Sequence, residues 1–197
     1  MAEIKSTMDL VMERAARIGK ASDEEMRRDK AAKKGVGLAV GFLDDTIADL
    51  AAEMRKLDRA EQMDVLKGVV ETLLRNVYLP RDEVQQERAE KAVRGILSLE
   101  GGSGEIGAIC RELTNIFSGY LQHRDQLRGQ LEEQIKMQYE AMLAQQPELQ
   151  SAGVKIDPTL QPKFQEEWRR VEGELSSQYG RALDQLKEEI GRRFGIQ

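Results

Sequence analysis

Two long stretches in the second half of the chain, 103–146 and 157–194, carry apolar residues at the spacing of an amphipathic α-helix. A loop with Pro147 near its start and Pro162 at its end separates them. A helix of about 40 residues is ~60 Å long, which exceeds the width of a compact domain of this size. We therefore predict that the two stretches fold back on each other as an antiparallel hairpin, part of which extends beyond a compact body.

The composition favours helices throughout the chain. Apolar residues make up 40% of the 197 residues and charged residues 33%, as in an ordinary globular protein, whereas aromatic residues make up only 5%. Ala, Glu, Gln, Arg, Leu and Met are abundant, and no run alternates β-branched and polar residues between turn signals. The sequence predicts an all-α fold.

Charge and cysteine content narrow the class of protein. Residues 1–100 carry 18 basic and 20 acidic side chains and 101–197 carry 12 and 15, so neither half has the basic surface of a nucleic-acid-binding domain. The single Cys110 shares an apolar helical stripe with Ile106 and Leu113, which predicts a buried thiol and a reducing compartment. No stretch is typical of a signal peptide or of a membrane-spanning helix, so we expect a cytoplasmic protein.

The first half, 1–100, is expected to form a body of short helices. Helical spacing and capping signals predict helices at 6–19, 22–35, 36–57, 58–79 and 82–99. Gly35 follows two lysines, which is typical of a helix C-terminus, so we expect a break or kink there. The glycine-rich stretch 101–104 marks the boundary with the hairpin domain, 103–197.

The hairpin changes character along its length. Its apolar stripe is wide over 106–121, and we expect this base, together with 183–194, to pack into the body. Over 124–177 the stripe narrows, which favours an arm formed by a two-stranded coiled coil. Folding at the loop places Tyr139 opposite 165–168 and Leu127 opposite 177–179. The loop itself, 147–162, is long enough to be either functional or a flexible connection.

Side chains for catalysis or metal binding are scarce. The chain has one His and one Cys, and Cys110 and His123 lie roughly 20 Å apart along one helix. Adjacent carboxylates on a helix point in different directions, and no Glu-x-x-His pair is present for a metal site in a helical bundle. We predict no catalytic residue, no metal site and no cofactor, and we expect that the protein is not an enzyme.

The glycine-containing segment 35–41 follows two lysines but lacks the spacing of a phosphate-binding loop. Gly37 and Gly41 lie one helical turn apart, so they are candidate residues for the close packing of another helix. The basic turn 27–34 that precedes them is a candidate for contact with a membrane surface.

Tyr139, Phe164 and Trp168 are the main aromatic residues of the expected arm. Their helical spacing suits the core of a coiled coil, but exposed aromatic residues also dominate many protein–protein interfaces. We treat the three as candidate partner-binding residues.

The N-terminal residues 3–14, EIKSTMDLVMER, resemble the start of a group of uncharacterised bacterial helical proteins. The resemblance implies a bacterial protein of unknown role and brings no activity, cofactor or site with it.

These features favour a non-enzymatic interaction or scaffold protein. Wide apolar stripes on the body and an arm with an uncovered second face favour self-association, most simply as a homodimer. We expect an additional protein partner, still unknown, and no nucleic acid. The alternative is a peripheral, stalk-like subunit beside a membrane, in which the basic turn 27–34 faces anionic lipid.

Overall fold

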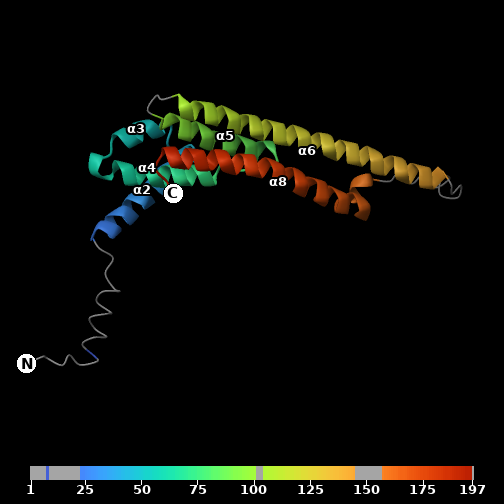
Figure 1. Ribbon diagram of the computed structural model, residues 1–197, viewed down its shortest axis with the longest axis horizontal. Helices are drawn as coiled ribbons and strands as arrows, with labels where there is room; N and C mark the ends of the chain where they lie inside the picture. Colours follow the sequence, from blue (N-terminus) through green and yellow to red (C-terminus); the bar gives the residue numbers. More distant parts are fainter. Residues whose placement is uncertain (1–7, 9–22, 101–103, 145–156, 197) are drawn as a thin grey trace, which may run out of the picture. The chain divides into compact units, whose positions relative to one another are not determined.

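The structure is a computed structural model that describes residues 8, 23–100, 104–144 and 157–196. Its helices are α2 (Asp23–Leu43), α3 (Leu50–Arg55), α4 (Arg59–Arg75), α5 (Glu83–Ser98), α6 (Glu105–Ala144), the short 3-10 helix η1 (Pro158–Leu160) and α8 (Pro162–Arg193) (Figure 1). The described residues contain no β-strand, so the prediction of an all-α fold is confirmed. The helix predicted over 6–19, and 145–156 of the predicted loop, lie outside the described residues.

By its internal contacts the chain divides into two compact units, 1–72 and 73–197, and the division falls within α4. Within the residues that the structure describes, no helix combines the length and the apolar character needed to cross a membrane.

In the first unit, α2 runs without interruption past Gly35, so the break predicted there is wrong. A Cβ atom at Gly35 would lie 2.8 Å from the amide nitrogen of Val69 in α4 and closer still to the carbonyl oxygen of Val65. At the facing position, a Cβ atom at Gly68 would lie 2.6 Å from the carbonyl oxygen of Ala32. The two glycines therefore let the backbones of α2 and α4 meet, and Gly35 serves a close approach rather than a helix end.

The two glycines predicted to pack against another helix do not do so. A Cβ atom at Gly37 would have no atom of the described residues within 4 Å, so the prediction is wrong for this residue. A Cβ atom at Gly41 would lie 2.8 Å from Cδ1 of Ile47 and 3.0 Å from Oγ1 of Thr46. Gly41 thus packs against the turn that follows α2, whereas Gly35 makes the contact between helices.

The helix predicted over 36–57 is interrupted by a turn at 44–49, between α2 and α3. The amide of Thr46 donates to the carbonyl oxygen of Gly41 at 2.9 Å, and Asp45 adopts a left-handed conformation with φ of 62°. Asp49 then caps α3, because its side chain accepts a hydrogen bond from the amide of Ala52 at 2.9 Å. The left-handed conformation at Asp45 is one that Asp and Asn adopt more readily than most residues.

In the second unit, α5 runs antiparallel to the first half of α6. The thiol of Cys110 lies 3.8 Å from the carbonyl oxygen of Val93, and Nη1 of Arg124 donates to the carbonyl oxygen of Arg81 at 3.3 Å. Because α5 begins at Glu83, this register brings its start level with Arg124. Buried residues of α6 and α8 in this unit include Ile106, Leu113, Phe117, Leu183 and Ile190.

The helices α6 and α8 lie side by side and run in opposite directions (Figure 1). The hydroxyl of Tyr120 lies 2.9 Å from Oγ of Ser176, and further along the pair Nζ of Lys163 donates to the side chain of Gln138 at 2.7 Å. By these two pairs, the residues opposite Leu127 lie within 169–174, so the predicted partners 177–179 are wrong. The difference arises because α6 continues to Ala144, beyond the residues that face the start of α8, and the short helix η1 also contacts α6.

Candidate functional site

The distal half of the hairpin has a small core of its own. Leu131 and Ile135 of α6 and Phe164 of α8 are buried together, and the half-buried Tyr139 and Trp168 pack against them. The rings of Phe164 and Trp168 are stacked, with centroids 6.5 Å apart and planes at 14°. Phe164 therefore lies inside the hairpin, and the prediction that it belongs to a partner-binding surface is wrong. Tyr139 and Trp168 present only part of their surface.

Arg124 joins three segments at the point where α5 begins. Its Nε lies 2.9 Å from the carboxylate of Glu172 on α8, and its guanidinium carbon lies 5.7 Å from the centre of the Trp168 ring. Its Nη1 donates to the carbonyl oxygen of Arg81, just before α5. The Arg124 side chain is only 16% exposed, so both the ion pair and the cation–π contact are shielded from solvent.

Arg124 was not among the residues predicted from the sequence, although its position carries a signal. It stands four residues after Tyr120 and three before Leu127, so a charged residue occupies the apolar stripe of α6. A charge on such a stripe needs a partner, and here the partner comes from the returning helix.

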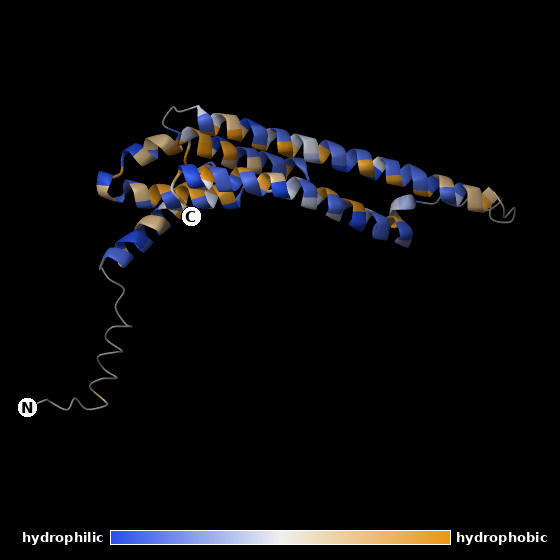
Figure 2. Cartoon of the chain, viewed as in Figure 1, coloured by the Kyte–Doolittle hydropathy of each residue, from blue (hydrophilic) through white to orange (hydrophobic). Residues whose placement is uncertain are grey.

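The far end of the hairpin exposes large apolar side chains. Met137 and Met142 near the end of α6 are 62% and 60% exposed, and Leu160 of η1 is 70% exposed. Figure 2 shows hydrophilic residues along much of the distal half of α6 and hydrophobic residues at its end. Met142 follows Ile135 by seven residues and so continues the buried side of α6 past the start of α8. The spacing of Met142 fits the apolar stripe of α6, but spacing alone does not tell that its side chain is exposed.

His123 bridges the two long helices. Its Nδ1 lies 2.6 Å from the hydroxyl of Tyr179, whose ring makes an edge contact with Tyr120 at 5.5 Å between centroids. His123 is exposed, and among the described residues no group of three or more His, Cys, Asp or Glu side chains is placed to hold a metal ion. The imidazole therefore serves as a link between α6 and α8.

The prediction of a buried thiol at Cys110 is confirmed. Burial raises the pKa of this thiol to about 11, with a smaller contribution from the nearby carboxylate of Glu100. A thiol with this pKa is almost entirely protonated at neutral pH, so it is a poor nucleophile.

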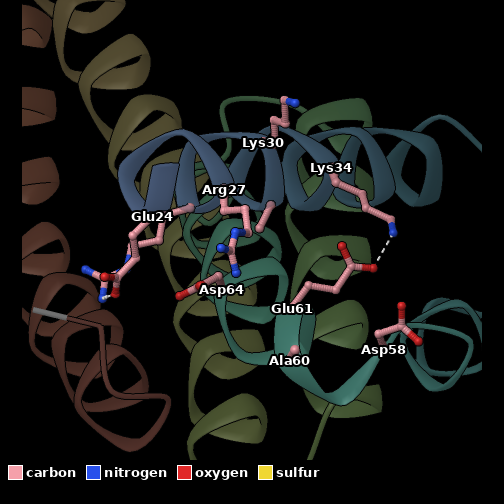
Figure 3. A pocket seen from close by; sticks show the side chains of 10 residues that line it. Glu24, Arg27, Lys30, Lys34, Asp58, Ala60, Glu61 and Asp64 are labelled. Carbon is pink, nitrogen blue, oxygen red and sulfur yellow. Dashed lines mark hydrogen bonds and ion pairs between the residues drawn. The ribbon is translucent and has the colours of Figure 1, made fainter. Parts of the chain in front are cut away.

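A cleft of about 590 Å³ opens in the first unit between α2 and the start of α4 (Figure 3). Lys34 bridges it through an ion pair with Glu61 at 2.6 Å, and Arg28 pairs with Glu24 at 2.7 Å along α2. Its lining residues are Glu24, Arg27, Arg28, Lys30, Ala31, Lys34, Asp58, Ala60, Glu61 and Asp64. The four basic side chains of this lining are thus matched by four acidic ones.

Comparison with known proteins places the chain in a family without an assigned role. Residues 51–192 match the model of a family of unknown function, DUF6657, and the chain belongs to that family. The match covers α3 to α8 and does not include residues 3–14, where the N-terminal resemblance lies. No curated protein and no solved structure gave a significant match.

Proposed function

We propose that this protein is a non-enzymatic interaction or scaffold protein that binds other proteins through the distal half of the α6–α8 hairpin. The observation that carries the proposal is the combination of an internal core at Leu131, Ile135 and Phe164 with exposed Met142 and Leu160 at the far end. An internal core lets the distal hairpin keep its shape without α5. Exposed Met and Leu side chains then supply adaptable contact area.

A second copy of the chain is the first partner that we propose, most simply in a homodimer. Burial of Met142 and Leu160 against a second hairpin would remove two exposed apolar side chains from water. Because burying one such side chain contributes roughly 1.5–3 kcal/mol, this change favours association at high protein concentration. We also place the protein in the bacterial cytoplasm, which suits a chain whose single cysteine is a buried free thiol.

The test replaces both exposed residues at the far end with glutamine, as Met142→Gln with Leu160→Gln. Val84→Gln is the matched control, because Val84 is 76% exposed at the start of α5 and lies outside the distal hairpin. Light scattering over a range of concentrations measures self-association, and capture from native lysate measures binding of other proteins. We expect the double variant to have a lower molar mass in solution and to capture fewer proteins. The control should match the unchanged protein in both measurements. Equal behaviour of the two variants would count against the distal hairpin as the binding element.

The alternative, a membrane-adjacent subunit, receives less support from the surroundings of the basic turn 27–34. Three of its five basic residues are paired with described acidic residues: Arg28 with Glu24, Lys33 with Asp29 at 2.6 Å, and Lys34 with Glu61. Only Arg27 and Lys30 carry a positive charge without such a pair. Attraction to anionic lipid grows with uncompensated positive charge near the membrane surface. Flotation with vesicles rich in phosphatidylserine tests this alternative, and binding that a charge reversal in 27–34 abolishes would restore it.

A further inference from the structure

We propose that the cleft of the first unit binds a peptide segment of a partner protein that carries both an acidic and a basic side chain. The two walls of the cleft differ in charge. Apart from Glu24, every charged lining residue of α2 is basic, whereas the wall at 58–64 contributes only acidic charges. The cleft therefore has a positive side and a negative side, and its total charge is zero.

Several of these charges are not engaged with one another. Arg27 and Lys30 on the basic wall, and the carboxylates of Asp58 and Asp64 on the acidic wall, make no ion pair or side-chain hydrogen bond with another described residue. Figure 3 shows Arg27 directed into the cleft on the side of Asp64, while Lys30 points away from it. A ligand can thus pair with Arg27 and Asp64 without first breaking an existing ion pair.

The separation of charge selects the kind of ligand. A polyanion is attracted to the basic wall but repelled by the acidic wall, whereas a polycation is attracted to the acidic wall and repelled by the basic wall. A ligand with one charge of each sign gains at both walls. Ala31 and Ala60 are the other lining residues, and their short side chains leave room between the walls.

The size and exposure of the cleft favour a peptide segment over a free amino acid. A volume of about 590 Å³ lies within the ~300–1,000 Å³ range of ligand sites and exceeds what a single amino acid fills. Exposed ion pairs contribute little each, and salt screens them. We therefore expect weak binding that high ionic strength removes. The site belongs to the first unit, so it is independent of the distal hairpin.

The test titrates four blocked tetrapeptides into the full chain labelled with ¹⁵N and follows the amide signals of α2 and 58–64. The sequences are Glu-Ala-Ala-Lys, Glu-Ala-Ala-Glu, Lys-Ala-Ala-Lys and Gln-Ala-Ala-Gln. We expect saturable shifts with the mixed-charge peptide and at least about twofold weaker binding of the other three. Equal binding of all four, or no shift with any, would overturn the proposal. Free glycine, which carries both charges without a peptide, would overturn the peptide assignment if it bound as tightly.

Charge reversals on one helix provide the matched control. Arg27→Glu should weaken binding of the mixed-charge peptide about two- to fivefold. Lys33→Glu makes the same change of charge on α2 outside the cleft and should leave binding unchanged. Combining Arg27→Glu with Asp64→Lys exchanges the two charges that face each other across the cleft and should recover part of the lost affinity. Equal losses for Arg27→Glu and Lys33→Glu would show an effect of total charge, and the cleft would not be a site.

Discussion

At the scale of single residues, Gly35 and Gly37 lie on one helix but have opposite surroundings. Gly37→Ala adds a methyl group in open space, so the better helix propensity of Ala should raise the free energy of unfolding by ~0.5–1 kcal/mol. Gly35→Ala forces a methyl group against the backbone of α4 at Val65 and Val69, and should lower the free energy of unfolding by about 1–3 kcal/mol. Urea unfolding followed by circular dichroism measures both changes. A lower free energy of unfolding for Gly37→Ala, or a higher one for Gly35→Ala, would contradict the packing of α2 on α4.

Cys110 provides a second prediction at this scale. Its pKa rises from the usual 9.0 to about 11 in the folded protein, so the folded state binds the proton more tightly than the unfolded state. This contribution to stability is complete below pH 9.0 and is lost as pH rises towards about 11. At pH 8 the folded protein should contain roughly 100-fold less thiolate than the unfolded chain. Reaction with a disulfide reagent, with and without denaturant, measures the difference, and equal rates would contradict burial of the thiol.

The roles of these residues could be predicted from the sequence only in part. Cys110 lies on an apolar stripe, so its burial follows from local spacing. Gly35 follows two lysines and so resembles a helix end, because the residues that explain it, Val65 and Gly68, lie in another helix. Phe164 and Met142 both fit an apolar stripe, and only the offset between α6 and α8 decides that the first is buried and the second exposed.

At the scale of helices, Arg124 should stabilise the junction where α5 begins beside α6 and α8. Arg124→Met removes the ion pair with Glu172 and the contact with Trp168, and should lower the free energy of unfolding by about 1–3 kcal/mol. Arg128→Met is the control, since its pair with Glu132 on α6 is more exposed and should cost under ~0.5 kcal/mol. Trp168 is the only tryptophan, so its fluorescence reports the junction directly. Equal changes in the two variants would contradict this role of Arg124.

The limits of the long helices were predictable to within a few residues, but their register was not. The predicted stretches 103–146 and 157–194 compare with Glu105–Ala144 for α6 and Pro162–Arg193 for α8, preceded by η1. Sustained apolar periodicity and the flanking Gly and Pro residues explain this agreement. The register depends on how far α6 extends past the start of α8, which a periodic pattern does not encode.

At the scale of the whole molecule, the register defines a shortened chain that should still fold. Replacement of 127–170 by a flexible linker of roughly four to six residues joins Gln126 to Val171, two positions that lie opposite each other across a helix pair spaced ~8–10 Å. The shortened chain retains the buried residues Leu113, Phe117 and Ile190. We expect Cys110 to stay protected from a disulfide reagent while the binding that we assign to the distal hairpin is lost.

A second deletion tests whether the protection of Cys110 depends on the register of α6 against α8. Replacement of 127–177 by the same linker joins Gln126 to a residue about two turns away from its observed partner, so it also removes the partner of Arg124, Glu172. This variant should have a more reactive Cys110 and a lower midpoint of unfolding than the first one. If both deletions expose Cys110 equally, the distal hairpin is required for the fold of the second unit, and a separate binding arm is excluded. If neither does, the fold of that unit does not depend on the register of α6 against α8.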